Sequence, residues 1–188
     1  SQQSEHCLLV ANGTDAIEIA LKAYDIGPGD AVGVPSVSFF ATAEAVINIG
    51  AHPVFIDVDP KTSLMDPESL KRIVARQGLK AIVPVHLYGM PAPISELERV
   101  CSPKGIKIVE DAAQAHGTRH SPDRVIGNSN NLVTYSFYPT KNLSAFGRNL
   151  ANCVGIEQGG DSCSATFWFS LKMKSCFRKH LSMHGNSL

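Results

Sequence analysis

The chain has 188 residues, of which 44% are hydrophobic and 18% are charged, a balance typical of a globular protein with a buried core. The 17 acidic and 17 basic residues cancel, which argues against a nucleic-acid-binding surface because such a surface needs a basic excess. No apolar run approaches the ~18 residues of a membrane span, so we expect no membrane partner. The length fits one domain.

Five cysteines are scattered along the chain without a Cys-x-x-Cys pair, so the sequence predicts neither a zinc site nor a redox motif, and no metal is expected. Free cysteines are typical of a reducing compartment, which favours the cytoplasm. The first residues lack the basic and apolar segments of a secretory signal. Because Ser1 stands inside what looks like a structural unit, the opening indicates a fragment.

Residues 6–11 are apolar and predict a strand buried on both faces. A turn follows at residues 12–15, and apolar residues at helical spacing up to Tyr24 predict a helix capped by Asn12 or Thr14. The backbone N–H groups at such a helix start form a ready anion site. A helix that is merely capped explains the same residues equally well.

A second strand is predicted at residues 31–34, followed by a helix with Ala43, Val46 and Ile47 facing inward. Phe39 and Phe40 stand at the junction between them. One of these rings is a candidate platform for a flat cofactor, although an aromatic side chain taken alone is more typical of the core.

Strands are also predicted at residues 53–58 and 80–85, with a helix between them that starts at Asp66 and Pro67. Pro84 cannot donate to a sheet ladder, so we expect an edge position or a bulge there. His86 follows this strand. It is either a ligand-contacting residue or a hydrogen-bonded structural histidine.

The pattern continues with a helix at residues 93–101 and strands at 107–110 and 132–137, while the polar residues 117–131 indicate a surface excursion. Strands alternating with short helices predict an α/β three-layer sandwich with a mostly parallel sheet. In such sheets ligands bind at the carboxyl ends of the strands. The residues expected at that edge are Gly13, Thr14, Phe39, His86, Asp111 and 136–141.

Lys141 and Asp111 carry the chemistry of this edge. Each follows an apolar strand, and Ser136 lies just before the lysine. A lysine, an acid and a hydroxyl at strand ends meet the needs of pyridoxal phosphate: the lysine holds the aldehyde as a Schiff base, the acid keeps the pyridine nitrogen protonated, and the hydroxyl binds phosphate.

Other residues fit the same cofactor. Gly13 and Thr14 offer N–H and hydroxyl groups to the phosphate, and Gln114 is placed to contact the ring hydroxyl or to steer the acid. Each residue alone has a plain structural explanation, since a strand-end aspartate often caps the next helix and a loop lysine is usually solvated. Their convergence on one edge favours the cofactor site.

Seven runs of residues resemble the DegT/DnrJ/EryC1/StrS family of pyridoxal-phosphate sugar aminotransferases. The likeness extends from about Cys7 to about Leu143. The runs are Ala-Asn-Gly-Thr-Asp-Ala at 11–16, Gly-Pro-Gly-Asp at 27–30, Val-Pro at 34–35 with Phe-Phe-Ala-Thr-Ala at 39–43, Pro-Val-Phe-Ile-Asp-Val-Asp at 53–59, Pro-Val-His-Leu-Tyr-Gly at 84–89, Glu-Asp-Ala-Ala-Gln-Ala-His-Gly at 110–117 and Ser-Phe-Tyr-Pro-Thr-Lys-Asn-Leu at 136–143.

The resemblance implies an incomplete large domain of fold type I and assigns roles to the candidate residues. Lys141 would be the Schiff-base lysine and proton shuttle. Asp111 would pair with the pyridine nitrogen, Gln114 would lie beside the ring oxygen, and Phe39 would stack on the ring. Ser136, Gly13 and Thr14 would hold the phosphate.

The resemblance also implies an activity and partners. Family members transfer an amino group, usually from glutamate, to a keto sugar nucleotide, and they complete the site across a homodimer interface. A related branch of dehydratases has histidine in place of the lysine, and Lys141 argues against that branch.

Residues 144–188 do not resemble the family, so we expect residues 1–143 to form a partial cofactor-binding large domain and 144–188 a divergent, frame-shifted or mis-spliced tail. The aromatic cluster at 167–169 in that tail would be exposed and prone to association if it does not pack. We also expect the second domain of the family to be missing. A non-catalytic paralogue that binds pyridoxal phosphate or a full-length partner is therefore an alternative to the enzyme.

A dinucleotide-binding oxidoreductase is disfavoured, since the turn at 12–15 lacks Gly-x-Gly-x-x-Gly.

Overall fold

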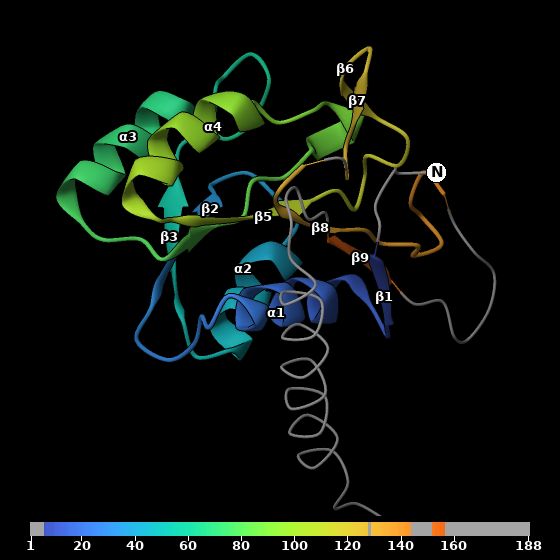
Figure 1. Ribbon diagram of the computed structural model, residues 1–188, viewed down its shortest axis with the longest axis horizontal. Coiled ribbons are helices and arrows are strands. Elements are labelled where there is room, and N and C mark those ends of the chain that lie inside the picture. The colour runs from blue at the N-terminus through green and yellow to red at the C-terminus, as the bar shows by residue number, and fades with distance from the viewer. Residues whose placement is uncertain (1–5, 128, 144–151, 157–188) are drawn as a thin grey trace, which may run out of the picture.

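The computed structural model describes residues 6–127, 129–143 and 152–156. A seven-stranded sheet forms the middle layer, with α1 and α2 on one face and α3 and α4 on the other (Figure 1). The helices are α1 (Gly13–Ala23), α2 (Ala41–Asn48), α3 (Pro67–Arg76) and α4 (Ile94–Cys101), with 3-10 turns η1 (Leu87–Gly89) and η2 (Ser102–Lys104). The predicted α/β three-layer arrangement is confirmed.

The order of strands in the sheet is β1-β9-β8-β5-β4-β2-β3. The strands are β1 (His6–Val10), β2 (Ala31–Pro35), β3 (His52–Ile56), β4 (Ala81–Ile82), β5 (Lys107–Asp111), β8 (Leu132–Thr134) and β9 (Asn152–Ile156). All pairs from β3 to β8 are parallel, whereas β9 runs antiparallel to both β8 and β1. Thus β9, from the stretch predicted to be a divergent tail, belongs to the sheet. The cluster at 167–169 lies outside the described residues.

β1 is not buried on both faces as predicted. Among the described strands it is the end strand of the sheet, and its partner is β9. Leu9 is 62% exposed and Cys7 is also exposed, whereas Val10 is buried. An apolar run is compatible with an edge strand, and periodicity alone does not distinguish the two positions.

Alternation along the strands divides the core into two layers. Val32 and Val34 of β2 pack in the layer of α1 and α2, while Ile82 of β4 packs in the layer of α3 and α4. Gly33 faces the second layer, where a Cβ atom would lie 3.0 Å from Ile82 Cγ2. The close approach of β2 and β4 therefore requires glycine at this position.

The predicted helix starts are confirmed. Asn12 caps α1 by accepting a hydrogen bond from the Asp15 N–H at 2.9 Å. Asp66 caps α3 by accepting from the N–H groups of Glu68 and Ser69. No helix in the described ranges is both long and apolar enough to cross a bilayer.

The buried face of α2 differs from the predicted one. Thr42, Ala45 and Val46 are buried, whereas Ile47 is 54% exposed. The helix is therefore rotated by about one residue from the phase that the apolar pattern predicts, and this rotation turns the polar Thr42 inward.

Pro84 lies between two internal strands, not at an edge. Regular pairing of β4 ends at Ile82, but the chain continues beside β5, where the Asp111 N–H donates to the Pro84 carbonyl at 2.9 Å. The His86 N–H donates in turn to the Asp111 carbonyl at 2.9 Å. Proline is tolerated here because its carbonyl is used while its missing N–H is not required.

Residues 117–131 are more than a surface excursion. They form a small hairpin of β6 (Arg119–Ser121) and β7 (Arg124–Val125), and Ile126, Ser129 and Asn131 after it are buried. Ser129 Oγ and Asn131 Nδ2 each donate to Glu110 Oε1 at 2.8 Å. The segment is therefore tied to β5 through a buried carboxylate.

Glu110 is fully buried and receives donors on both oxygens. His86 Nε2 lies 3.0 Å from Glu110 Oε2, and His120 Nε2 lies 3.5 Å from the same oxygen. Burial alone would raise the pKa of Glu110, but the neighbouring His120, His86 and Asn131 groups hold the pKa below its ordinary value. The carboxylate is thus ionised and its hydrogen bonds stabilise the fold.

We predict that Glu110→Gln lowers the free energy of unfolding at neutral pH by about 3 kcal/mol, because the buried donors lose a charged partner. A carboxyl whose pKa is lowered in the folded state stabilises the protein at pH values above its ordinary pKa. This stability is lost as the pH falls toward the folded-state pKa. The difference from wild type should therefore shrink in acid. Denaturant unfolding at several pH values measures it, with Glu96→Gln, an exposed acid on α4, as the control. Equal losses in the two variants would contradict the prediction.

Candidate active site

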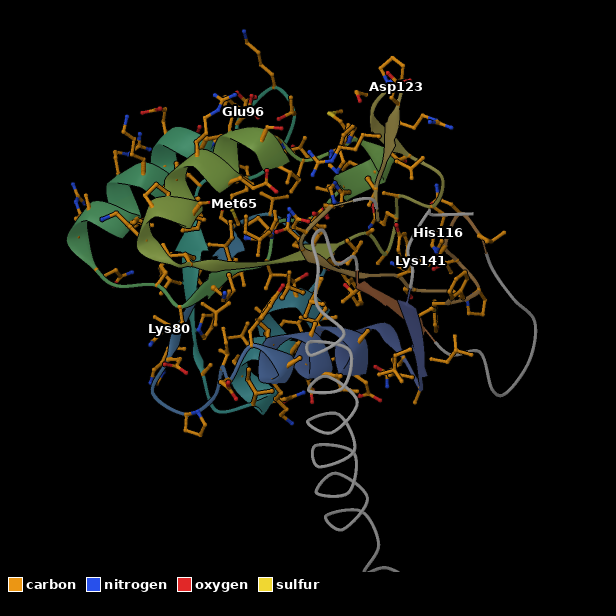
Figure 2. The ribbon with its side chains drawn as sticks, in the orientation of Figure 1. Met65, Lys80, Glu96, His116, Asp123 and Lys141 are labelled. Atoms are coloured by element: carbon orange, nitrogen blue, oxygen red, sulfur yellow. The ribbon has the colours of Figure 1, made fainter. Side chains whose placement is uncertain are left out.

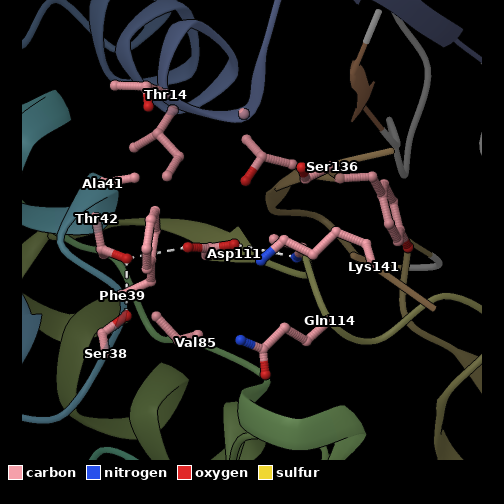
Figure 3. A pocket seen from close by; sticks show the side chains of 15 residues that line it. Thr14, Ser38, Phe39, Ala41, Thr42, Val85, Asp111, Gln114, Ser136 and Lys141 are labelled. Atoms are coloured by element: carbon pink, nitrogen blue, oxygen red, sulfur yellow. Dashed lines mark hydrogen bonds between the residues drawn. The ribbon is translucent and has the colours of Figure 1, made fainter. Parts of the chain in front are cut away.

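The seven predicted site residues line one pocket at the carboxyl edge of the sheet (Figure 3). The space inside it, including the part open to solvent, is about 490 Å³. These residues come from four separate parts of the chain: Gly13, Thr14, Phe39, Asp111, Gln114, Ser136 and Lys141. The structure therefore brings them together, while their roles stay predictions.

Asp111 is the acid of the pocket, and both of its carboxylate oxygens accept hydrogen bonds. Oδ1 accepts from the Ala113 N–H and Oδ2 from Thr42 Oγ1, each at 3.1 Å. Burial raises the pKa of Asp111 above its ordinary value, and these two donors together with the charge of Lys141 oppose that rise only in part. A buried carboxylate with two fixed donors is suited to receive one more positively charged N–H group.

Lys141 reaches the same pocket from the turn after β8. Its backbone N–H donates to the Tyr138 carbonyl at 2.8 Å, which closes the turn. Its Nζ atom lies 5.5 Å from the centre of the Phe39 ring. The ring is 68% exposed, so the expectation that a phenylalanine here belongs to the core is wrong, and Phe40 at 67% is exposed as well. Phe39 presents an open aromatic face beside the amine (Figure 3).

The start of α1 and Ser136 form the polar end of the pocket. The first N–H groups of a helix have no acceptor within it, and those of Gly13 and Thr14 lie at this end. Ser136 is buried, and its Oγ accepts the Tyr138 N–H at 3.4 Å, which leaves its hydroxyl proton available to a ligand. These donors and the positive end of α1 suit a phosphate group.

Gln114 is fixed by a contact that the sequence did not reveal. Its Oε1 atom accepts the Tyr88 N–H at 2.8 Å, and Tyr88 adopts a left-handed backbone with φ of 55°. Because the amide oxygen is occupied, the amide nitrogen faces the pocket as a donor (Figure 3). Gln114 is thus oriented to bind an acceptor such as a ring oxygen.

Two further pocket residues, Ser38 and Thr42, had no predicted role. Both line the pocket, and their hydroxyl oxygens lie 2.9 Å apart. Thr42 bonds to Asp111 on its other side. A signal for Thr42 exists in the sequence, since it is a polar residue at i, i+3 and i+4 spacing with the apolar Ala45 and Val46.

His86 does not line the pocket, contrary to the expected convergence. Side chains alternate across the sheet, so Val85 faces the pocket while His86 faces Glu110 on the other side. His86 is completely buried, and its Nδ1 accepts the Ala92 N–H at 2.9 Å. It is the structural histidine of the two alternatives.

The nitrogens of His86 and His120 and the Glu110 carboxylate lie within 4.8 Å of one another, as metal ligands do. However, His86 Nδ1 accepts a hydrogen bond, so the ring proton is on Nε2 and is donated to Glu110. A metal needs that nitrogen unprotonated. We therefore treat the cluster as a hydrogen-bond network and assign no metal to it.

The pocket combines an amine, a buried acid, an exposed aromatic face, an oriented amide donor and a phosphate-type end. This set matches a phosphorylated pyridine aldehyde, because each group of that molecule finds a chemically complementary partner. Residues 2–148 match the family model described as the DegT/DnrJ/EryC1/StrS aminotransferase family. The chain belongs to this family.

The curated relatives are much longer than this chain. The chain is 43% identical over 145 residues to the pleiotropic regulatory protein of Geobacillus stearothermophilus, covering 77% of the chain and 38% of that protein. It is also 43% identical over 142 residues to the UDP-N-acetyl-3-dehydro-alpha-D-glucosamine 3-aminotransferase of Acidithiobacillus ferrooxidans, covering 76% of the chain and 38% of the relative. The chain thus spans well under half the length of both relatives.

A solved structure supports the fold assignment. NtdA from Bacillus subtilis, crystallised with bound cofactor PMP, is 30% identical with a TM-score of 0.73, covering 84% of this chain and 34% of that one. The predicted fold, an incomplete large domain of fold type I, is confirmed by this likeness.

His116 gives a test of the site's electrostatics. It lies beside Lys141 (Figure 2) and packs against the Phe137 ring, 5.0 Å between centres. Burial lowers the pKa of His116, and the positive charge of Lys141 lowers it further.

We predict that Lys141→Gln raises the His116 pKa, because one of the two effects that disfavour the imidazolium is removed. The pKa should stay below the ordinary histidine value, since His116 remains partly buried. Titration of the His116 ring protons by NMR measures the change. Lys107→Gln is the control, since Lys107 lies at the start of β5 over the Tyr24 ring. An unchanged His116 pKa in Lys141→Gln would be evidence against the proximity of these groups.

Proposed function

We propose that this protein binds pyridoxal phosphate and transfers an amino group, from glutamate, to a keto sugar nucleotide as a cytoplasmic homodimer. The observation that supports the proposal best is that Lys141 and Asp111 line one pocket, whose other end carries N–H and hydroxyl donors suited to a phosphate. The family assignment supports aminotransfer as the reaction class.

The described residues fit the cofactor group by group. Asp111, buried and bonded on both oxygens, would hold the pyridine nitrogen, and Phe39 would cover one face of the ring. Gly13, Thr14 and Ser136 would hold the phosphate. When bound, pyridoxal phosphate supplies an electron sink that allows an amino group and a proton to leave a carbon atom.

Lys141 performs two tasks in this proposal. Its uncharged amine is the nucleophile that anchors the cofactor, and the same nitrogen later carries a proton to and from the substrate carbon. The Nζ atom is bound by no carboxylate within salt-bridge distance in the described ranges, so it is free to move between these tasks. The turn closed by Tyr138 keeps the residue at the pocket while the side chain moves.

The substrate class comes from the relatives. The Acidithiobacillus ferrooxidans relative, 43% identical, is named for a UDP-linked dehydro sugar. This name supports a keto sugar nucleotide as the acceptor. Phe39, Phe40 and Tyr88 are exposed near the pocket, which suits an interface that a second copy covers. Cys7 and Cys101 are free thiols, in keeping with the reducing cytoplasm.

A second candidate function is binding without turnover, either of the cofactor or of a full-length partner. It is favoured by the name of one relative at 43% identity, the pleiotropic regulatory protein, which is regulatory and not enzymatic.

We predict that pyridoxal phosphate added to the protein produces a visible absorbance band shifted from that of the free cofactor, and that the band is absent in Lys141→Ala. Borohydride followed by peptide mass analysis should locate the label on Lys141. Lys107→Ala, a lysine outside the pocket, is the matched control and should retain the band. A label on other lysines with none on Lys141 would refute the cofactor assignment.

Turnover separates the two candidate functions. Under the enzyme proposal, the protein with glutamate and a UDP-linked keto sugar releases 2-oxoglutarate, and Lys141→Ala reduces the rate by at least about 100-fold, because general acid–base catalysis is lost along with the nucleophile. A cofactor band without any 2-oxoglutarate would favour the binding function.

A further inference from the structure

Thr42 connects the pocket acid to a second hydroxyl. It is 2% exposed on the first turn of α2, and its Oγ1 donates to Asp111 Oδ2 at 3.1 Å. The same Oγ1 lies 2.9 Å from Ser38 Oγ. Both residues line the pocket, and neither is among the groups that would touch a cofactor in the proposal above.

The direction of these bonds follows from the number of protons available. A threonine hydroxyl has a single proton, and Thr42 gives it to the carboxylate, which when ionised can only accept. Ser38 must therefore donate to Thr42. The result is a one-way chain, Ser38 to Thr42 to Asp111, that ends on a carboxyl oxygen.

We infer that Thr42, backed by Ser38, is a positioning residue that favours the ionised form of Asp111 and aims it at the ring nitrogen of the cofactor. The inference rests on the proposed function for its ligand, but the charge state of Asp111 is a property of the chain itself. Thr42 acts through Asp111 and does not touch the reacting atoms.

The surroundings of Asp111 explain why the chain of hydroxyls is needed. Burial raises the pKa of Asp111, which favours a neutral acid that could not stabilise a pyridinium. The opposing groups are the Ala113 N–H, the Thr42 hydroxyl and the charge of Lys141 from the β8 side. The start of α2 adds its positive dipole end near Thr42.

Contacts on both sides fix the Thr42 hydroxyl. On one side its Oγ1 donates to Asp111 Oδ2. Ser38 stands before α2 and holds the other side of the Thr42 oxygen. The acid is thus oriented by two hydroxyls on one side and a backbone N–H on the other.

The test compares Thr42→Val, which keeps the shape and removes the donor, with Thr42→Ser, which keeps the donor. In the cofactor-free protein, carbon-13 NMR should show the Asp111 pKa higher in Thr42→Val than in wild type, with Thr42→Ser close to wild type. With the donor gone, the ionised carboxylate is lost at a higher pH as the solution is acidified. An unchanged Asp111 pKa in Thr42→Val would overturn the inference.

The second measurement uses pyridoxal phosphate. Loss of one charge-assisted hydrogen bond should weaken its binding about ten-fold in Thr42→Val, with the acid limit of binding moved to higher pH. Nitrogen-15 NMR of the labelled cofactor should show a less protonated ring nitrogen. Wild-type affinity and wild-type nitrogen protonation in Thr42→Val would overturn the role, while Thr42→Ser should restore both.

The two measurements separate the inference from the proposed function. If no variant binds pyridoxal phosphate, the function fails, and the Asp111 titration still decides whether Thr42 holds the acid ionised. If Thr42→Val does not fold, as judged by circular dichroism, Ser38→Ala removes the outer link of the same chain. Its Asp111 pKa should rise by a smaller amount, and no rise would overturn the inference.

Discussion

The buried carboxyl group of Asp111 is the constraint on which the site depends. An unpaired carboxylate costs several kcal/mol when it leaves water, so the surrounding chain must supply donors at fixed positions. Here they come from two directions: Ala113 N–H from its own turn and Thr42 from the start of α2. The parallel sheet makes this possible, because the carboxyl ends of β2 and β5 bring α2 and Asp111 to the same edge.

Glu110, the acid next to Asp111, is also buried and surrounded by hydrogen-bond donors, but on the opposite face of the sheet. Glu110 and Asp111 are consecutive, and strand alternation sends one to the hairpin side and the other to the pocket. Glu110 is fully satisfied by the chain, through His86, Ser129 and Asn131. Asp111 keeps an open side toward the pocket, so of two buried acids only one is available to a ligand.

Much of the fold could be predicted from sequence because it rests on local signals. Asn12 and Asp66 mark helix starts by their own side chains, and the strands alternate with helices at regular spacing. Lys141 and Asp111 could be identified because strand ends meet at one edge. Three features could not be predicted: the rotation of α2, the exposure of β1 and the burial of residues 117–131. Each depends on which other element packs against that segment, and the local sequence does not contain this information. Thr42 was missed for that reason, because the predicted rotation of α2 had turned it outward.

Three aromatic rings near the pocket are left exposed to solvent. Phe39, Phe40 and Tyr88 are 68%, 67% and 79% exposed, although each would gain about 1.5–3 kcal/mol from full burial. Tyr88 also holds a left-handed backbone, which costs on the order of 1 kcal/mol for a residue other than glycine. In return, its N–H fixes Gln114 toward the pocket. Strain and exposure therefore lie beside the open pocket, whereas the two core layers beneath are closed.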